Sequence, residues 1–368
     1  MIDSLKRYLQ NLPGPSINEK ILVIESDDWG SIRMPSKGVF DILQQRGYQP
    51  ETDPYLKFDS LASEDDLTNL FDTLHSVKNS NGESPIITAN AVMANPDFDK
   101  IRNSGFQDYH YELFTDTLKK YPHHQNSLAL WKEGNSNYLF HPQFHGREHL
   151  NGFQWMKSLQ NEDELLMEAF DLNMISISSV DKTMRFSYME GLDYFSKEEK
   201  EVKNEILEEG LNMFSKTFGY NSKSFIANCY IWDEANEKCL NSNEVKLIQG
   251  ISNQIIPELN GGHRHRTKRH YFGQRNSLGQ YYSIRNVFFE PSLSPKFNWV
   301  DDAMRRINIA FNCKKPAVIG THRLNYIGHI HEQNRTANLS LLKSLLSKVV
   351  KKWPDIKFVT SDQLLKFL

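Results

Sequence analysis

Short runs of apolar and β-branched residues recur along the whole chain, and stretches of helical periodicity separate them. The first run covers 21–24 and the last covers 356–359. Most runs lack the polar alternation of a half-exposed strand, which is typical of parallel sheets covered on both faces. Seven or eight such strands with helical crossovers predict an α/β fold, a single α/β barrel that is either complete or distorted.

Two of the intervening helices have readable ends. Ser196 and Glu199 form a capping box, and Gly219 follows the apolar stripe that begins after it. Near the carboxyl terminus, leucines spaced by three and four residues end at Pro354. No repeat and no linker rich in Pro, Gly or Ser divides the sequence. We therefore expect one domain over 1–368, with a core of about 20–365 and an N-terminal extension over 1–19.

Composition excludes several classes of protein. The 43 Lys and Arg residues against 46 Asp and Glu residues give a net charge of −3, which argues against a dedicated nucleic-acid binder. The three cysteines, Cys229, Cys239 and Cys313, rule out a disulfide framework. The first residues lack the apolar core of a signal peptide, and no run approaches the ~18 apolar residues of a membrane span. We expect a cytoplasmic protein.

Adjacent acidic residues follow the first apolar run. Asp27 and Asp28 stand where the run 21–24 would end as a strand. Two neighbouring carboxylates raise each other's pKa unless a cation lies between them. One of the pair would then bind a divalent ion while the other acts as a base. The alternative is an acidic turn that caps a helix.

A pair of histidines follows the run 138–140. His141 and His145 are separated by three residues, and Pro142 restricts His141 to extended geometry and suits the first position of a helix. Side chains four apart on a helix lie about 5–6 Å apart, so both imidazoles would bind one metal ion. The alternative is a group of solvated loop histidines.

A further histidine follows the run 317–319. His322 would serve as a general acid or base, because its ordinary pKa is near neutrality. A hydrogen-bonded structural histidine is the alternative. Three such motifs after three separate predicted strands favour a shared site at the mouth of a barrel.

The order of these motifs over about 20–365 resembles the polysaccharide deacetylase superfamily, that is, carbohydrate esterase family 4 and its NodB-homology relatives. The resemblance implies a distorted (β/α)7 barrel with a mononuclear Asp-His-His metal site. It implies Zn²⁺ as the usual cofactor, with Co²⁺, Mn²⁺ or Ni²⁺ as further options. By the same match Asp28, His141 and His145 would be the metal ligands, Asp27 the catalytic base and His322 the general acid.

The sequence departs from the family pattern in two motifs. The Arg-x-Pro motif that supplies an arginine to the base has no counterpart, and Arg33, Arg147 and Arg323 are the candidates to replace it because each lies in a motif loop. The Asp-Trp pair that orients the acid histidine is matched only by Asn298 and Trp299.

Other residues are candidates for substrate contacts or for support of the ligands. Trp29 and Trp232 follow predicted strands and would stack on a sugar ring, although such aromatic residues also fill barrel loops. Glu290 would face the site from another strand end. His149, four residues after His145, would be a further ligand or would support the ligands. The basic run 263–270 would bind a phosphate, or is a solvated charged loop.

These observations predict a metal-dependent hydrolase that removes an acetyl group from an N-acetylated sugar of a polysaccharide or its precursor. A cytoplasmic substrate would be a precursor, with a phosphate link that suits the basic run. One alternative is a glycoside hydrolase that uses a carboxylate pair from Glu25, Asp27 and Glu290. The other is a barrel that binds glycan or metal without turnover.

Overall fold

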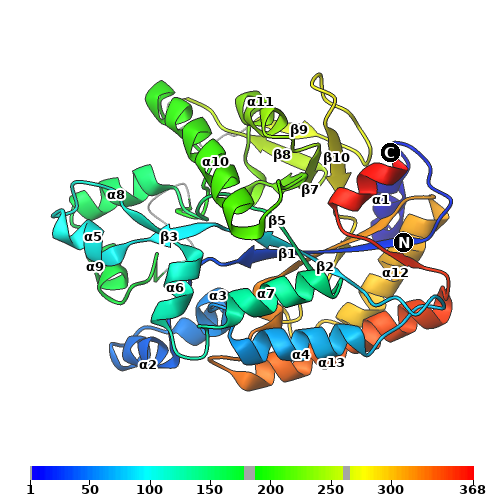
Figure 1. Ribbon diagram of the computed structural model, residues 1–368, viewed down its shortest axis with the longest axis horizontal. Helices are drawn as coiled ribbons and strands as arrows, with labels where there is room; N and C mark the ends of the chain where they lie inside the picture. The colour runs from blue at the N-terminus through cyan, green and yellow to red at the C-terminus, as the bar shows by residue number, and fades with distance from the viewer. Residues whose placement is uncertain (1, 178–186, 260–265) are drawn as a thin grey trace.

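The computed structural model describes residues 2–177, 187–259 and 266–368. Its central element is a nine-stranded sheet in the order β10-β7-β6-β5-β2-β1-β12-β11, with β13 also paired to β1 (Figure 1). Every pairing in this sheet is parallel. Its strands are β1 (Ile21–Trp29), β2 (Ile87–Ala91), β5 (Phe140–Phe144), β6 (Ser224–Ile226), β7 (Leu247–Gly250), β10 (Tyr281–Ile284), β11 (Val287–Phe288), β12 (Ala317–His322) and β13 (Lys357–Phe358).

Helices cover the sheet on both sides. In Figure 1, α4, α7 and α13 lie on one side of β1 and β2, and α10 and α11 lie on the other. The helices are α1 (Ile2–Asn11), α2 (Lys37–Gln45), α3 (Pro54–Phe58), α4 (Glu64–His75), α5 (Phe98–Asn103), α6 (Phe114–Lys120), α7 (Ser127–Ser136), α8 (Gly152–Gln160), α9 (Glu164–Asp171), α10 (Lys197–Phe218), α11 (Glu234–Ser242), α12 (Trp299–Asn312) and α13 (Glu332–Lys352).

Short elements complete the chain. Two antiparallel pairs lie outside the main sheet, β3 (Ala94–Pro96) with β4 (Tyr111–Leu113) and β8 (Asn253–Ile256) with β9 (Arg266–Arg269). The 3₁₀ turns are η1 (Pro50–Thr52), η2 (Asn228–Tyr230), η3 (Arg323–Tyr326) and η4 (Asp362–Phe367). Within the described ranges, no helix combines the length and the apolar character needed to cross a membrane.

Both predicted helix boundaries are confirmed, but the capping box is not closed, because the Glu199 side chain accepts from the Phe195 N–H (2.7 Å) instead of the Ser196 N–H. The Ser196 hydroxyl accepts a hydrogen bond from the backbone N–H of Glu199 at the start of α10, and Gly219 ends the helix in the left-handed conformation with a φ of 80°. The helix α13 ends at Lys352, two residues before Pro354. Local signals therefore fix these helix ends.

The two faces of β1 pack in two different hydrophobic clusters. Leu22 and Ile24 belong to the main hydrophobic core, which also contains apolar residues of α4 and α13. Ile21 and Val23, on the opposite face, pack in a smaller cluster. Because side chains alternate along a strand, that second face continues to 25 and 27. It is apolar at the amino end of the strand and acidic at the carboxyl end.

The two edge strands of the sheet, β10 and β11, follow one another in the chain. Only Arg285 and Asn286 separate β10 from β11. The Arg285 N–H donates to the Gly250 carbonyl at the end of β7 (2.8 Å), and the Asn286 N–H donates to the Val318 carbonyl in β12 (3.2 Å). The predicted mainly parallel α/β sheet is confirmed, and closure into a seven-stranded barrel stays a prediction. The predicted strand over 174–177 is wrong, because that run forms none.

Candidate metal centre

Side chains from several carboxyl ends of the parallel strands meet at one edge of the sheet. They lie in the last residues of β1 and β12 or shortly after β5, β10 and β11, and they include both aspartates of the first motif. This is the edge at which the sequence places its chemistry, and it is where ligand sites of parallel α/β folds lie.

A β-bulge turns Asp28 toward this site. Strict alternation would point Asp27 and Asp28 to opposite faces of β1. The register with β2 shifts between Ser26 and Trp29, and Asp28 has a φ of 72°. Such a bulge re-aims a side chain at the cost of local strain. Both carboxylates therefore reach the same site from adjacent positions.

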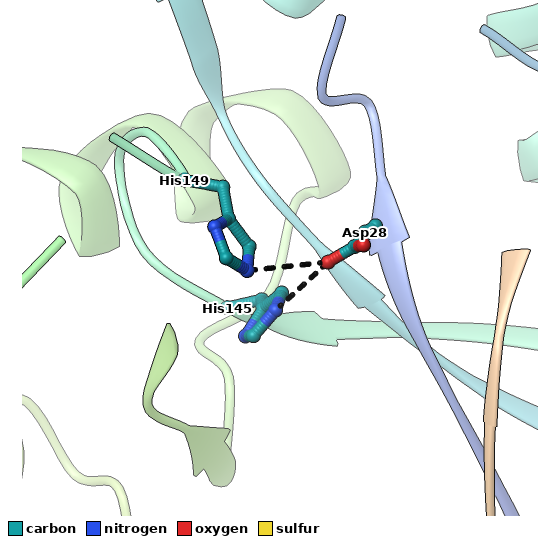
Figure 2. A group of neighbouring side chains, drawn as sticks. All are labelled: Asp28, His145 and His149. Carbon is teal, nitrogen blue, oxygen red and sulfur yellow. Dashed lines mark ion pairs between the residues drawn. The ribbon is translucent and has the colours of Figure 1, made fainter. Parts of the chain in front are cut away.

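Asp28, His145 and His149 form a compact buried group (Figure 2). The Asp28 Oδ1 atom lies 3.5 Å from His145 Nε2 and 3.3 Å from His149 Nε2. One ligand atom from each residue lies within 4.8 Å of the other two. Two imidazoles and one carboxylate are a donor set that suits Zn²⁺ and similar divalent ions.

The hydrogen bonding of the group fits a cation. Asp28 Oδ1 and His145 Nε2 are buried and have no hydrogen-bond partner among the described residues, which is costly unless an ion satisfies them. The other ring nitrogen of His145, Nδ1, lies 2.9 Å from the Ile226 carbonyl, an arrangement that fixes the tautomer with Nε2 as a free ligand. Burial lowers the pKa of His149 to about 3, so its imidazole is neutral, as a metal ligand must be.

Arg285 holds Asp27 in place. Its Nη1 and Nη2 atoms donate to the two Asp27 oxygens at 2.6 and 2.7 Å, and its Nε donates to Glu25 at 2.7 Å. Asn90 also donates to Asp27, at 2.7 Å. Burial alone would raise the pKa of Asp27, but the Arg285 guanidinium outweighs it and lowers the pKa to about 2. The carboxylate is ionised and its orientation is fixed.

Glu290 orients His322. The His322 Nδ1 atom lies 2.7 Å from Glu290 Oε1, and Asn325 donates to the other Glu290 oxygen at 2.6 Å. Burial alone would lower the pKa of His322, but the Glu290 carboxylate raises it to about 10. The Nε2 atom of the protonated ring lies 3.9 Å from Asp27 Oδ2. His322 therefore carries a proton at neutral pH beside the metal group.

A cavity of about 240 Å³ opens onto these groups. Arg33 lies in its wall, 3.6 Å from Asp28 and 3.9 Å from Asp59, and the Tyr55 ring lies against the guanidinium, 5.7 Å from ring centre to carbon. The lining residues are Asp27, Asp28, Arg33, Tyr55, His145, His149, Ser187, Met189, Ala227, Cys229, Tyr230 and His322.

The structure does not bring His141 to the group. The strand β5 begins at Phe140 and continues through Pro142, so the predicted helical turn at this proline is wrong. Over a strand, four residues span about 13 Å, too far for His141 and His145 to share one ion. His141 instead contacts Asn135 (2.7 Å) and Asp362 (3.6 Å). His149 takes the place that the sequence assigns to His141.

The arginine beside Asp27 is Arg285, which the sequence analysis did not name. Among the three named candidates, Arg147 pairs with Glu148 at 2.8 Å, and Arg323 pairs with Asp59 at 2.9 Å. Only Arg33 lines the cavity. The signal for Arg285 was present in the sequence, because this arginine directly follows the apolar run of β10.

Of the residues expected to orient His322 or to face the site, Glu290 does so, whereas Asn298 and Trp299 do not. Glu290 faces the site, as the sequence suggests, through its contact with His322. Asn298 caps α12 and the Trp299 indole N–H donates to the Ser294 carbonyl, so Glu290 rather than this pair contacts the histidine.

The two tryptophans do not offer a ring to a substrate. Trp29 and Trp232 are each 1% exposed and pack in the main core, and neither lines the cavity. Of the basic run 263–270, residues 263–265 lie outside the described residues. Residues 266–269 form the exposed strand β9, and His270 is buried against Tyr282.

No protein-family model and no curated protein matches this sequence. Among solved structures, the chain bears a likeness to a 4-alpha-glucanotransferase from Thermococcus litoralis at 8% identity and a TM-score of 0.45, over 96% of this chain and 41% of that one. An alpha-amylase, AmyC, from Thermotoga maritima matches at 10% identity and a TM-score of 0.46, over 96% of this chain and 75% of the amylase. A protein from Mycobacterium smegmatis assigned as a polysaccharide deacetylase matches at 9% identity and a TM-score of 0.41, over 96% of this chain and 93% of that protein. Because these identities and TM-scores are low, we infer function from the site itself.

Proposed function

We propose that the protein is a metal-dependent hydrolase that removes an acetyl group from an N-acetylated sugar of a polysaccharide or its precursor. One observation carries the proposal. Three ligand atoms of buried residues lie beside a fixed carboxylate and a protonated imidazole, and two of these atoms have no hydrogen-bond partner among the residues that the structure describes. The sequence resemblance to polysaccharide deacetylases supplies the substrate class.

In this proposal Asp28, His145 and His149 hold one divalent ion, with Zn²⁺ the first choice. The bound ion would lower the pKa of water and polarise the acetyl carbonyl. Replacing His141 by His149 keeps the Asp-His-His composition that the sequence resemblance implies. The spacing of the ligands changes, because both histidines then come from the segment that follows β5.

In this proposal Asp27 accepts one proton as the base and His322 donates another as the acid. Asp27 accepts the proton of the attacking water on a carboxylate oxygen, while Arg285 keeps that carboxylate ionised and oriented. His322 gives its Nε2 proton to the departing amine, and Glu290 at Nδ1 fixes which nitrogen faces the site. Arg33, beside Asp28, adds positive charge to the wall where negative charge develops.

The carboxylates required by a glycoside hydrolase are already engaged. Glu25 is fully buried and accepts from Arg285 and from the Ser361 hydroxyl (2.8 Å). Glu290 accepts from Asn325 and contacts His322. Neither Glu25 nor Glu290 lines the metal cavity, so Asp27 is the one carboxylate of these three that faces it, whereas such cleavage needs a pair. We therefore favour acetyl removal.

The test measures acetate release from N-acetylglucosamine oligomers by the metal-loaded protein, the chelated protein and the Asp28→Asn variant. We expect release that disappears on chelation, returns with Zn²⁺ and is absent from Asp28→Asn. Acetate release that survives exhaustive chelation would contradict the proposal. New reducing ends without acetate would instead indicate glycosidase activity.

We also propose that the sheet closes as the predicted distorted (β/α)7 barrel within one domain. The segment 281–288 would then be the strand that joins β7 to β12, since its first half pairs with one and its second half with the other.

A further inference from the structure

A second cavity, of about 400 Å³, shares a wall with the metal cavity. Gly146, Arg147 and Glu148 line this second cavity, whereas the flanking His145 and His149 line the metal cavity. Most of the remaining wall comes from α8 and α10, both labelled in Figure 1. Its volume is within the range of about 300–1,000 Å³ that is usual for small-molecule sites.

The walls of the second cavity are mainly apolar. The helix α8 contributes Phe153 and Met156, and α10 contributes Ile206 and Leu207. Leu150 and Leu192 add further aliphatic surface from the connecting segments. Such a surface favours a ligand with an apolar body.

One cation in this wall has no carboxylate partner. Lys203 is 1% exposed and donates to Asn151 Oδ1 (3.1 Å) and to the Gly191 carbonyl (2.7 Å), both of which are neutral. Over the part of the chain that the structure describes, no carboxylate lies within 4.0 Å of its ammonium. The Phe153 ring lies 5.4 Å from the ammonium to the ring centre. An ammonium has three N–H donors, and among the described residues only two of them make hydrogen bonds, so the third can reach a ligand.

Nearby carboxylates offset the charge of Lys203 only in part, and Glu148 is already paired. Arg147 and Glu148 pair with each other at 2.8 Å, and the Tyr109 hydroxyl donates to Glu148 at 3.0 Å. Lys157 adds a second unbalanced cation at the exposed rim. Burial is costly for a charge and lowers the pKa of Lys203 to about 8, although the Glu199, Glu148 and Asp193 carboxylates act to raise it. An anion beside it would remove this cost.

We propose that the second cavity binds an organic carboxylate with an apolar chain or ring. The carboxylate pairs with the Lys203 ammonium, and the apolar part lies against α8 and α10. This site does not depend on the proposed hydrolase activity. Its occupant would contact the segment that carries two metal ligands, so the two cavities are physically connected through 145–149.

Isothermal titration calorimetry with octanoate tests the proposal, with octanol as the uncharged probe. We expect saturable octanoate binding that is tighter than octanol binding. Lys203→Met should weaken it by about tenfold or more, because a charge-assisted hydrogen bond is lost. Lys157→Met, at the exposed rim, is the matched control and should change affinity by less than about fivefold. Equal binding of octanoate and octanol would overturn the proposal.

Two further variants keep the test decisive. Ile206→Trp fills the cavity while keeping Lys203 in the sequence, and it should abolish octanoate binding while circular dichroism stays native. Asp28→Asn removes a metal ligand and should leave octanoate affinity unchanged. Loss of octanoate binding in Asp28→Asn would indicate that octanoate binds the metal ion, and it would contradict the proposed second site. This conclusion would hold whatever the result of the acetate assay.

Discussion

At the amino end of β1, Ile21 and Val23 pack among aliphatic side chains, whereas at its carboxyl end Glu25 and Asp27, on the same face, are held by Arg285. Both ends are buried, but they are stabilised differently. Dispersion and the hydrophobic effect tolerate small changes of shape at the first end. The second end depends on complete pairing of buried charges. Changes at the two ends should therefore have different consequences for metal binding and stability.

The largest effect should come from the histidines at the carboxyl end of β5. His149→Ala removes a ligand, so we expect loss of bound Zn²⁺ and of turnover. His141→Ala, at the amino end of the same strand, is the matched control and should keep both. Elemental analysis of the purified variants measures the difference. Loss of metal in His141→Ala but not in His149→Ala would restore the assignment made from the sequence.

Arg285→Gln should have the next largest effect. It leaves Glu25 and Asp27 without their cation, which we expect to lower the free energy of unfolding by about 3–5 kcal/mol. Turnover should fall by about 10²-fold or more, because the base is no longer held. Arg335→Gln breaks another buried pair, with Asp66 at 2.9 Å, and should destabilise without loss of turnover. Urea unfolding and acetate release separate the two effects, and equal losses of turnover would refute the role given to Arg285.

Glu290→Gln should change the pH dependence more than the rate at neutral pH. Glu290 raises the pKa of His322 to about 10, so removing its charge lowers that pKa. Because His322 acts in its protonated form, activity would then be lost at a lower pH as the pH rises. The pH profile of kcat measures this shift. An unmoved alkaline limb would mean that His322 is not the acid.

The smallest effect should come from the amino end of β1. Ile21→Val deletes one buried methylene, and we expect a loss of about 0.5–1.5 kcal/mol in unfolding free energy. Metal content and turnover should not change, because no charged contact is altered. Thermal unfolding and elemental analysis of the variant provide the check. A loss of metal here would show that the two ends of the sheet are not independent.

Apolar runs and helix caps made much of the fold predictable. The end of β12 at His322 follows from the local pattern, since buried strands are continuous apolar runs. The strand β1 instead continues past its apolar run, through Glu25 and Asp27 to Trp29, because Arg285 pairs with both carboxylates. The position of β5 could not be predicted in this way. Pro142 argues for a helix start, yet it lies in a strand whose neighbour β6 pairs at only one position, Phe144 with Phe225.

Side chains compensate for that proline. The Gln143 side-chain oxygen accepts hydrogen bonds from the backbone N–H groups of Lys223 (3.0 Å) and Ser224 (2.8 Å), which join β5 to the start of β6. A contact between residues so far apart in the chain has no local signature. The same holds for Arg285, whose partners Glu25 and Asp27 lie near the opposite end of the sequence. Tertiary pairing, not local propensity, decided both positions.

Gly320 in β12 leaves room for the Arg285 side chain. A Cβ atom there would lie 2.7 Å from the Arg285 side-chain carbon Cδ, so the guanidinium reaches Asp27 only because this strand position is bare. The residue has no functional group of its own, yet a Cβ atom at this distance would require the Arg285 side chain to shift. A random library selected for activity should therefore return glycine at 320 as strictly as it returns the ionisable residues, although nothing at that position ever touches a substrate.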